Sequence, residues 1–216
     1  MATKSLDTIE DTPQNTSEPK DRAGIDRNLG WWLVITAGIS LISSLILSYE
    51  RMALYIDAGH SSVCDINALL NCGTVMRTPQ AATFFGFPNP FVGLMAYTAL
   101  LTVGVAMLAG ARFKPWFWWC VQAGVTFALG FVVYLWFQTT FIIGALCLFC
   151  MIVWIMTVIM LVKVSVRNIQ TGLIRLPETL RDASKNWEWF TISILLLIIF
   201  GTVLIHFMSV IVQLFA

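Results

Sequence analysis

Charge is scarce in this chain. Only 12% of its 216 residues are Asp, Glu, Lys or Arg, while 58% are hydrophobic. Soluble domains carry about 25% charged residues, so this composition is typical of a membrane protein. The net charge of +1 gives no indication of nucleic-acid binding. With two histidines in the whole sequence, the chain also lacks clustered imidazole ligands that would mark a metal path through a membrane.

We do not expect the start of the sequence to be a signal peptide. The first apolar run begins late, follows acidic residues and has no small-residue cleavage site after it. Residues 1–29 are polar and contain no aromatic side chain. Such a segment cannot bury enough apolar surface to offset its chain entropy. We therefore expect a disordered cytoplasmic tail at 1–29 and a membrane domain at 30–216.

Long apolar runs are what the sequence does contain. A membrane-spanning helix needs about 20 mostly apolar residues, and five runs approach or exceed that length. They predict an all-α integral membrane fold, with an outer loop at 50–90 in which TPQAATFF forms a half-helix cap. Only QTT separates the third and fourth runs, so these two should form a tight antiparallel hairpin. The predicted spans are 31–49, 91–111, 116–137, 141–162 and 189–214.

The distribution of positive charge predicts the orientation, because Lys and Arg are enriched on the cytoplasmic side. With the N-terminus inside, only Arg51 and Arg77 of the 13 Lys and Arg residues lie outside. We therefore expect a cytoplasmic N-terminus and an external C-terminus. The inside residues are Lys4, Lys20, Arg22, Arg27, Arg112, Lys114, Lys163, Arg167, Arg175, Arg181 and Lys185.

This orientation brings four of the five cysteines towards the outer face. Cys64 and Cys72 lie in the outer loop, and Cys147 and Cys150 lie near the outer end of the fourth predicted helix. Disulfides persist in oxidising compartments, so this is the side where dithiol chemistry is expected. Cys120 lies near the inner end of the third helix, far from the others, and we predict that it is structural.

The sequence CLFC places Cys147 and Cys150 at i, i+3 spacing. On a helix this spacing gives a Cα separation within disulfide range, and a helix N-terminus favours the reactive thiolate. For an isolated pair, two inert buried thiols would be the simpler interpretation. The presence of a second pair in the loop favours a redox role for Cys147 and Cys150, because a loop thiolate can attack a helix disulfide and pass on two electrons. One structural disulfide that staples the loop is the alternative for Cys64 and Cys72.

Electrons delivered to a membrane helix need a lipid-soluble acceptor, and a quinone meets this need. A quinone site is expected to be a mostly apolar pocket with a few fixed polar groups. Asn89 and Thr78 are the polar candidates, whereas ordinary packing is the alternative role for the aromatic residues. The candidate apolar walls are Phe84, Phe85, Phe87, Phe91 and Trp154.

Three other classes of protein could carry cysteines in this arrangement. Four thiolates could hold zinc in a metal-binding or transport protein, and stoichiometric zinc in the purified protein would favour that class. A purely structural membrane protein with two inert disulfides would not reduce added quinone. A DsbB-like enzyme has its Cys-x-x-Cys pair in the first outer loop and its spaced pair in the second. This chain has the reverse order, so we reject the DsbB-like class.

The motifs CDINALLNCGTVM, FGFPNPFVG and CLFC resemble the vitamin K epoxide reductase family, in its bacterial branch, over residues 31–165. The resemblance implies a four-helix bundle around a quinone, with a fifth helix. It implies that Cys147 and Cys150 form the active-site disulfide, with Cys150 facing the ring and Cys147 attacked by a loop cysteine. The other roles it implies are a shuttle pair at Cys64 and Cys72, a hydrogen bond from Asn89 to a quinone oxygen, the family Ser/Thr position at Thr78 and the family Asp at Asp65.

The sequence departs from some relatives at two points. Many bacterial members carry a thioredoxin-like domain after the fifth helix, whereas this sequence stops at Ala216. We therefore expect a separate DsbA-like thioredoxin-fold partner outside the cytoplasm of a bacterial cell. Trp154 stands where vertebrate members have Tyr, which argues against assuming epoxide reduction. Menaquinone or ubiquinone is the expected electron acceptor.

Overall fold

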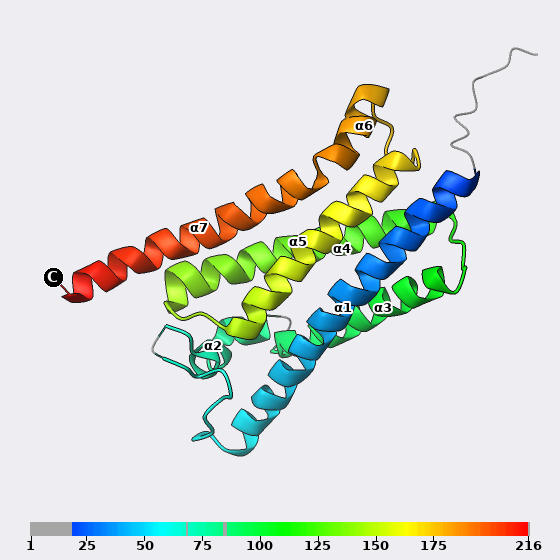
Figure 1. Cartoon of the computed structure of the whole chain (residues 1–216). Helices are drawn as coiled ribbons and strands as arrows, with labels where there is room; N and C mark the ends of the chain where they lie inside the picture. The colour runs from blue at the N-terminus through cyan, green and yellow to red at the C-terminus, as the bar shows by residue number, and fades with distance from the viewer. Residues whose placement is uncertain (1–18, 68, 84–85, 216) are drawn as a thin grey trace, which may run out of the picture.

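The computed structural model describes residues 19–67, 69–83 and 86–215, with the backbone alone at 19–22 and 209–215. Within these residues, five helices are long and apolar enough to cross a membrane, as the sequence predicts. The chain is an all-α, multi-pass membrane protein (Figure 1). In order, its helices are α1 (Pro19–Ile56), α2 (Cys72–Met76), η1 (Pro79–Ala82), α3 (Asn89–Leu108), α4 (Pro115–Phe137), η2 (Gln138–Ile143), α5 (Leu148–Gln170), α6 (Glu178–Asn186) and α7 (Glu188–Phe215).

Helix α1 begins well before the predicted span, so the prediction of disorder is wrong for residues 19–29. The polar first turns are held by packing and by an ion pair. Leu29 is buried in the bundle, and Asp26 accepts a hydrogen bond from Arg167 Nε at 2.9 Å. Residues 1–18 of the predicted tail lie outside the described residues.

Helices α1 and α3 form the tightest pair in the bundle. Glycines allow their backbones to approach, since a Cβ at Gly104 would lie 3.0 Å from the Val34 nitrogen of α1. Helix α5 packs against α1 on one side and against α4 and α7 on the other. Helices α3 and α4 are not packed along their lengths.

The connection between α4 and α5 is longer than predicted. Instead of a helix from 141, the chain forms the π-helix η2, and Gly144 then turns it in the left-handed region at φ 70°. Helix α5 therefore begins at Leu148, with Cys147 as its extended N-cap residue. The segment FIIGALC is as apolar as a span, which explains why hydropathy alone places the helix start too early.

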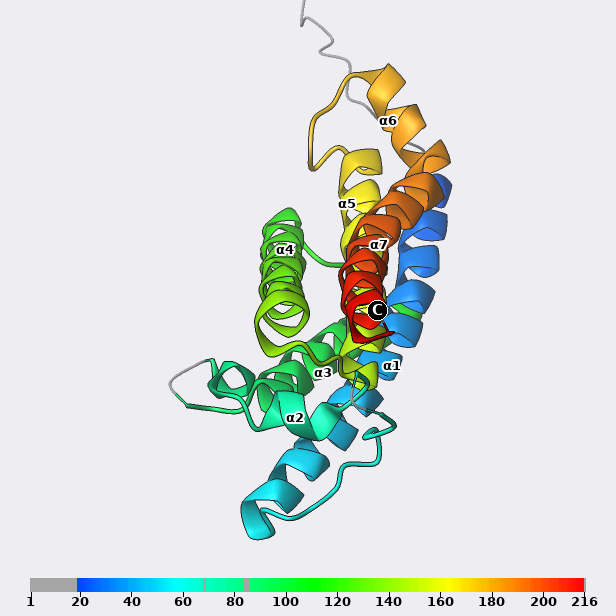
Figure 2. The same cartoon turned by 90° about the vertical axis from the view of Figure 1, so that its left-hand side faces the viewer.

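The outer segment after α1 folds against the ends of the long helices rather than away from them. Residues 69–71 pair in parallel with Leu146, where Asn71 N–H donates to Leu146 O at 2.9 Å and Leu146 N–H donates to Leu69 O at 2.7 Å. The expected half-helix cap is the short helix η1, whereas residues 84 and 85 of TPQAATFF lie outside the described residues. Both views place α2 and α6 at opposite ends of the bundle (Figures 1 and 2).

Candidate functional site

Three sulfur atoms meet at the α2 end of the bundle. Cys64 and Cys72 form a disulfide, and Cys147 Sγ lies 3.2 Å from Cys72 Sγ. The three residues are at most 2% exposed. Cys147 and Cys150 are free thiols that interact with each other. The two pairs that the sequence predicts are therefore in direct contact, with the loop pair oxidised and the helix pair reduced.

Local backbone structure explains why Cys72 meets Cys147. The parallel pairing of 69–71 with Leu146 places the two cysteines immediately after paired residues. Asn71 then caps α2, because its side chain accepts a hydrogen bond from Thr74 N–H at 2.6 Å. Cys72 is thus the first residue of a capped helix and Cys147 is the N-cap of another. Both sulfurs lie in an apolar cluster with Leu47 and Ala145.

Asp65 shapes the turn that carries Cys64. One carboxylate oxygen accepts from Gly73 N–H at 2.8 Å and the other from Ser62 N–H at 3.0 Å. The carboxylate therefore joins the segment before Cys64 to the residue after Cys72. A Cβ at Gly73 would lie 2.8 Å from Asp65 Oδ2, so glycine is needed for this contact.

A second anchor of the outer loop was not predicted from the sequence. Glu50 of α1 is 1% exposed, and its Oε2 lies 2.9 Å from His60 Nε2 and 2.8 Å from Ser62 Oγ. Arg77 extends the anchor by donating to the carbonyl oxygens of Ala58 and His60. The signal in the sequence was an acidic residue at the end of an apolar run, followed by a loop histidine.

The geometry favours sulfur exchange over metal binding. Among the described residues, Cys64, Cys72 and Cys147 are the one group of at least three potential ligands whose donor atoms lie close together, within 4.8 Å. Structural zinc sites use four ligands as a rule, with deprotonated thiolates. Here two of the three sulfurs are joined to each other.

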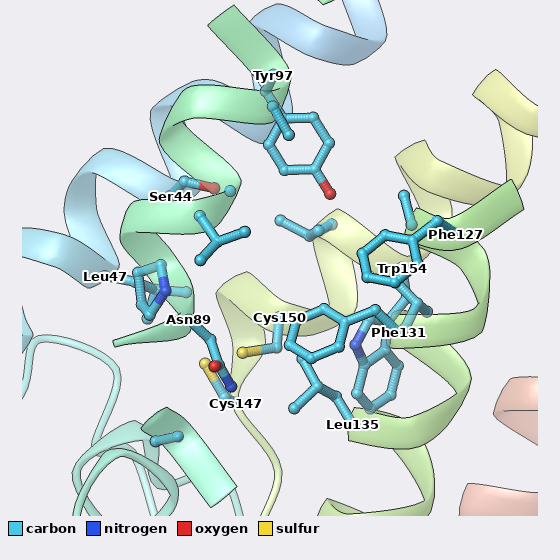
Figure 3. Close-up of a pocket in the computed structure, with 18 of the residues that line it drawn as sticks. Ser44, Leu47, Asn89, Tyr97, Phe127, Phe131, Leu135, Cys147, Cys150 and Trp154 are labelled. Carbon is cyan, nitrogen blue, oxygen red and sulfur yellow. The ribbon is translucent and has the colours of Figure 1, made fainter. Parts of the chain in front are cut away.

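A cavity of about 510 Å³ begins at the cysteines and runs between α3 and α4. Figure 3 shows Cys150, Trp154 and Asn89 around its outer part. The predicted residues Thr78, Asn89 and Trp154 line it together with Cys147 and Cys150. Cys120 lines its other end and takes no part in the sulfur cluster.

The predicted phenylalanine walls are not where the sequence suggested. Phe87 is 47% exposed, and its ring packs against Phe91 with centroids 5.6 Å apart. Neither residue is among the described residues that line the cavity. Phe84 and Phe85 lie outside the described residues. The aromatic walls instead include Phe127 and Phe131 of α4, together with the predicted Trp154 of α5.

The polar groups of the cavity differ in whether they already form hydrogen bonds within the protein. The Asn89 amide is committed to the η1 segment, since Nδ2 donates to Gln80 O at 2.8 Å and Oδ1 accepts from Thr83 N–H at 2.9 Å. Thr78 Oγ1 donates to Val75 O at 2.7 Å. Trp154 is 1% exposed, and its indole N–H has no hydrogen-bond partner among the described residues. The Trp154 indole N–H is therefore an uncommitted donor in the cavity, next to the turn of α5 that carries Cys150.

Two adjoining dithiols beside an apolar cavity in a helical bundle define a membrane-embedded thiol–disulfide oxidoreductase site. Comparison with protein-family models gives a match to the Vitamin K epoxide reductase family over residues 31–165. The chain belongs to the vitamin K epoxide reductase family, whose members are quinone-linked disulfide oxidoreductases. A comparison with curated proteins finds no match.

Proposed function

We propose that the protein is a thiol:quinone oxidoreductase that forms disulfide bonds in a partner protein. The observation that carries this proposal is the 3.2 Å approach of Cys72 Sγ to Cys147 Sγ, beside a cavity that Cys150 lines. Nucleophilic exchange needs two sulfurs in contact, and the arrangement supplies an incoming pair, a contact point and an outgoing pair.

The exchange balances at each step. After the partner reduces the loop pair, the Cys72 thiolate attacks the Cys147–Cys150 disulfide at Cys147 and releases the Cys150 thiolate. The Cys64 thiolate then attacks Cys72, which restores the Cys64–Cys72 disulfide and releases the Cys147 thiolate. A loop disulfide beside two helix thiols is the arrangement expected at the end of this exchange.

The cavity fits a quinone ring. Its walls are mostly apolar, its volume is within the range of about 300–1,000 Å³ usual for ligand pockets, and it contains the unpaired Trp154 N–H. A bound quinone, menaquinone or ubiquinone, would accept the two electrons and two protons that Cys147 and Cys150 release when they close their disulfide. We assign Trp154 the hydrogen bond to a ring oxygen and Asn89 the positioning of η1 over the ring. Thr78 also lines this cavity.

The partner in this proposal is a separate DsbA-like thioredoxin-fold protein outside the cytoplasm. Val63 and Ile66 flank Cys64 and are 72% and 63% exposed, which gives the loop an apolar contact surface beside the shuttle cysteine. Lys and Arg gather at the α6 end of the bundle, which supports a cytoplasmic N-terminus and cysteines at the outer face of a bacterial inner membrane.

A trapping experiment tests the relay. In the double variant Cys64→Ala, Cys150→Ala, neither resolving thiol is present, so a Cys72–Cys147 disulfide should accumulate when a mild oxidant such as diamide is added to take the two electrons from the two thiols. Mass spectrometry of the digested protein would identify the linked peptides, and the wild-type chain should lack them. Cys72→Ala, Cys150→Ala is the matched control. Absence of the Cys72–Cys147 link from the first variant, or quinone reduction by a Cys147→Ala or Cys150→Ala chain, would refute the relay.

A further inference from the structure

A tyrosine in the cavity has no part in the relay. Tyr97 lies on α3, is 6% exposed and lines the cavity. Figure 3 shows its hydroxyl directed into the cavity space, on the side away from Cys147. Tyr97 shares this lining with Cys150 and Trp154. A ring that extends from Cys150 along the cavity past Trp154 would meet the Tyr97 hydroxyl, which contacts Thr157 further along α5.

The hydrogen-bond partners of the Tyr97 hydroxyl determine whether it can donate or accept in the cavity. Thr157 Oγ1 lies 2.8 Å from Val153 O and 3.1 Å from the Tyr97 hydroxyl oxygen. A carbonyl oxygen can only accept, so the single Thr157 hydroxyl hydrogen points to Val153. The Tyr97 hydrogen then points to Thr157, because this is the one assignment in which both contacts are hydrogen bonds. Tyr97 consequently presents only lone pairs to the cavity.

A group that only accepts hydrogen bonds distinguishes the two redox forms of a quinone. The oxidised ring offers carbonyl oxygens, which only accept, while the reduced ring offers hydroxyl groups, which donate. A quinol adds a hydrogen bond to Tyr97 and keeps the Thr157 contact. A quinone gains one only if the Tyr97 hydrogen leaves Thr157, so the number of bonds is unchanged. The Trp154 N–H can donate to an oxygen of either form and does not favour the quinol in this way.

We propose that Tyr97, held as an acceptor by Thr157, makes the cavity bind quinol more tightly relative to quinone, an inference that rests on the proposed quinone site. Preferential binding of the reduced form raises the reduction potential of the bound acceptor. For a two-electron couple, each tenfold change in the affinity ratio corresponds to about 29.6 mV. Thr157 is thus a positioning residue that acts through Tyr97 and makes electron transfer from Cys147 and Cys150 more favourable.

The test compares the affinities of both redox forms. Purified full-length protein in detergent would be titrated anaerobically with a short-chain ubiquinone analogue and with its quinol, followed by tryptophan fluorescence quenching. In Tyr97→Phe, quinol binding should weaken about three- to tenfold, the value of one neutral hydrogen bond, while quinone binding changes little. In Thr157→Val, the released Tyr97 hydrogen should tighten quinone binding, whereas Thr157→Ser should behave as wild type.

Controls separate this inference from the proposed function. Tyr49→Phe removes a hydroxyl from a side chain that is 69% exposed, and both affinities should stay unchanged. If both forms bind but the ratio is the same in wild type, Tyr97→Phe and Thr157→Val, the inference is wrong and the proposed quinone site stands. If neither form binds the wild-type chain, both are wrong. A thermal melt of each variant shows that the fold is retained.

Discussion

At the scale of single residues, hydrogen bonds hold the sulfurs in place. Asp65 accepts from two backbone N–H groups, one on each side of the loop disulfide. Such charge-assisted bonds are stronger than neutral ones. A side chain that is not itself redox-active thereby sets the distance over which Cys72 must reach Cys147.

Asp65→Asn should slow the thiol exchange between loop and helix. An amide has one acceptor oxygen, so at least one of the two N–H groups loses its partner, at a cost of about 1–3 kcal/mol in a buried setting. We expect partner oxidation to fall severalfold, measured in stopped-flow assays with a reduced thioredoxin-fold protein. Asp57→Asn is the matched control, because Asp57 accepts from Gly59 N–H in an exposed turn. Equal rates for the two variants would contradict this role.

Trp154→Phe tests the uncommitted indole donor in the cavity. The substitution keeps an aromatic ring and removes the N–H, so quinone binding should weaken about three- to tenfold. The readout is the KM for quinone with a reduced thioredoxin-fold protein as electron donor, whose oxidation is followed in parallel. Trp116→Phe, at a side chain that is 64% exposed, is the control. An unchanged KM would indicate that Asn89, and not Trp154, forms the hydrogen bond to the quinone ring oxygen.

At the scale of elements, the connection between α4 and α5 determines where Cys147 lies. A π-helix adds a residue to a helical turn and often marks a functional site. Here η2 and the left-handed Gly144 bring the chain into the pairing between Leu146 and the outer loop. The position of the reactive thiol therefore depends on an irregular segment as well as on α5.

Gly144→Ala should displace this segment. A residue with a Cβ is strained at a positive φ, by about 1–2 kcal/mol, and the backbone around Cys147 would shift to relieve it. We expect a lower melting temperature in detergent and slower formation of the Cys72–Cys147 link in the trapping background. Gly130→Ala, at a helical glycine with open space around it, should leave both unchanged or raise the melting temperature. Equal effects of the two changes would be inconsistent with this account.

Much of the helical layout could be predicted, because length and hydropathy are sufficient to find spanning helices. The start of α5 could not, since residues 141–147 are apolar and only Gly144 hints at a turn. The clustering of the cysteines followed from topology. The roles of Glu50, Tyr97 and the cavity walls depended on contacts between distant segments, for which a single sequence gives no local signal.

At the scale of the whole molecule, one end of the bundle holds the sulfur atoms and the other end holds a cluster that joins three helices. Opposite the sulfurs, Lys163 lies between Trp32 and Trp189, with its Nζ 4.5 and 4.4 Å from their ring centroids and 2.8 Å from Glu188 Oε1. Cation–π contacts of this kind contribute about 2 kcal/mol or more when desolvated. This cluster ties α7 to α1 and α5.

Lys163→Met should loosen α7 without touching the cysteines. Removing one partner of a buried ion pair costs about 3–5 kcal/mol, and the partial exposure of Glu188 places this pair at the low end. We expect a clear fall in the melting temperature and faster proteolysis after α6, with partial recovery in Lys163→Met, Glu188→Gln. Lys185→Met, on an exposed residue of α6, should melt as wild type does. A Lys163→Met chain that melts like the Lys185 control would exclude the clamp.

The burial of Cys64, Cys72 and Cys147 also insulates the electron path. Small thiols in solution meet no sulfur of these three in the described conformation. A reductant must first displace the segment that Glu50 and Asp65 hold in place. A partner protein that binds this segment can displace it, whereas a freely diffusing thiol makes too few contacts to do so. In the proposed function, the fold would thereby protect the quinone pool from reductants that carry no protein to be oxidised.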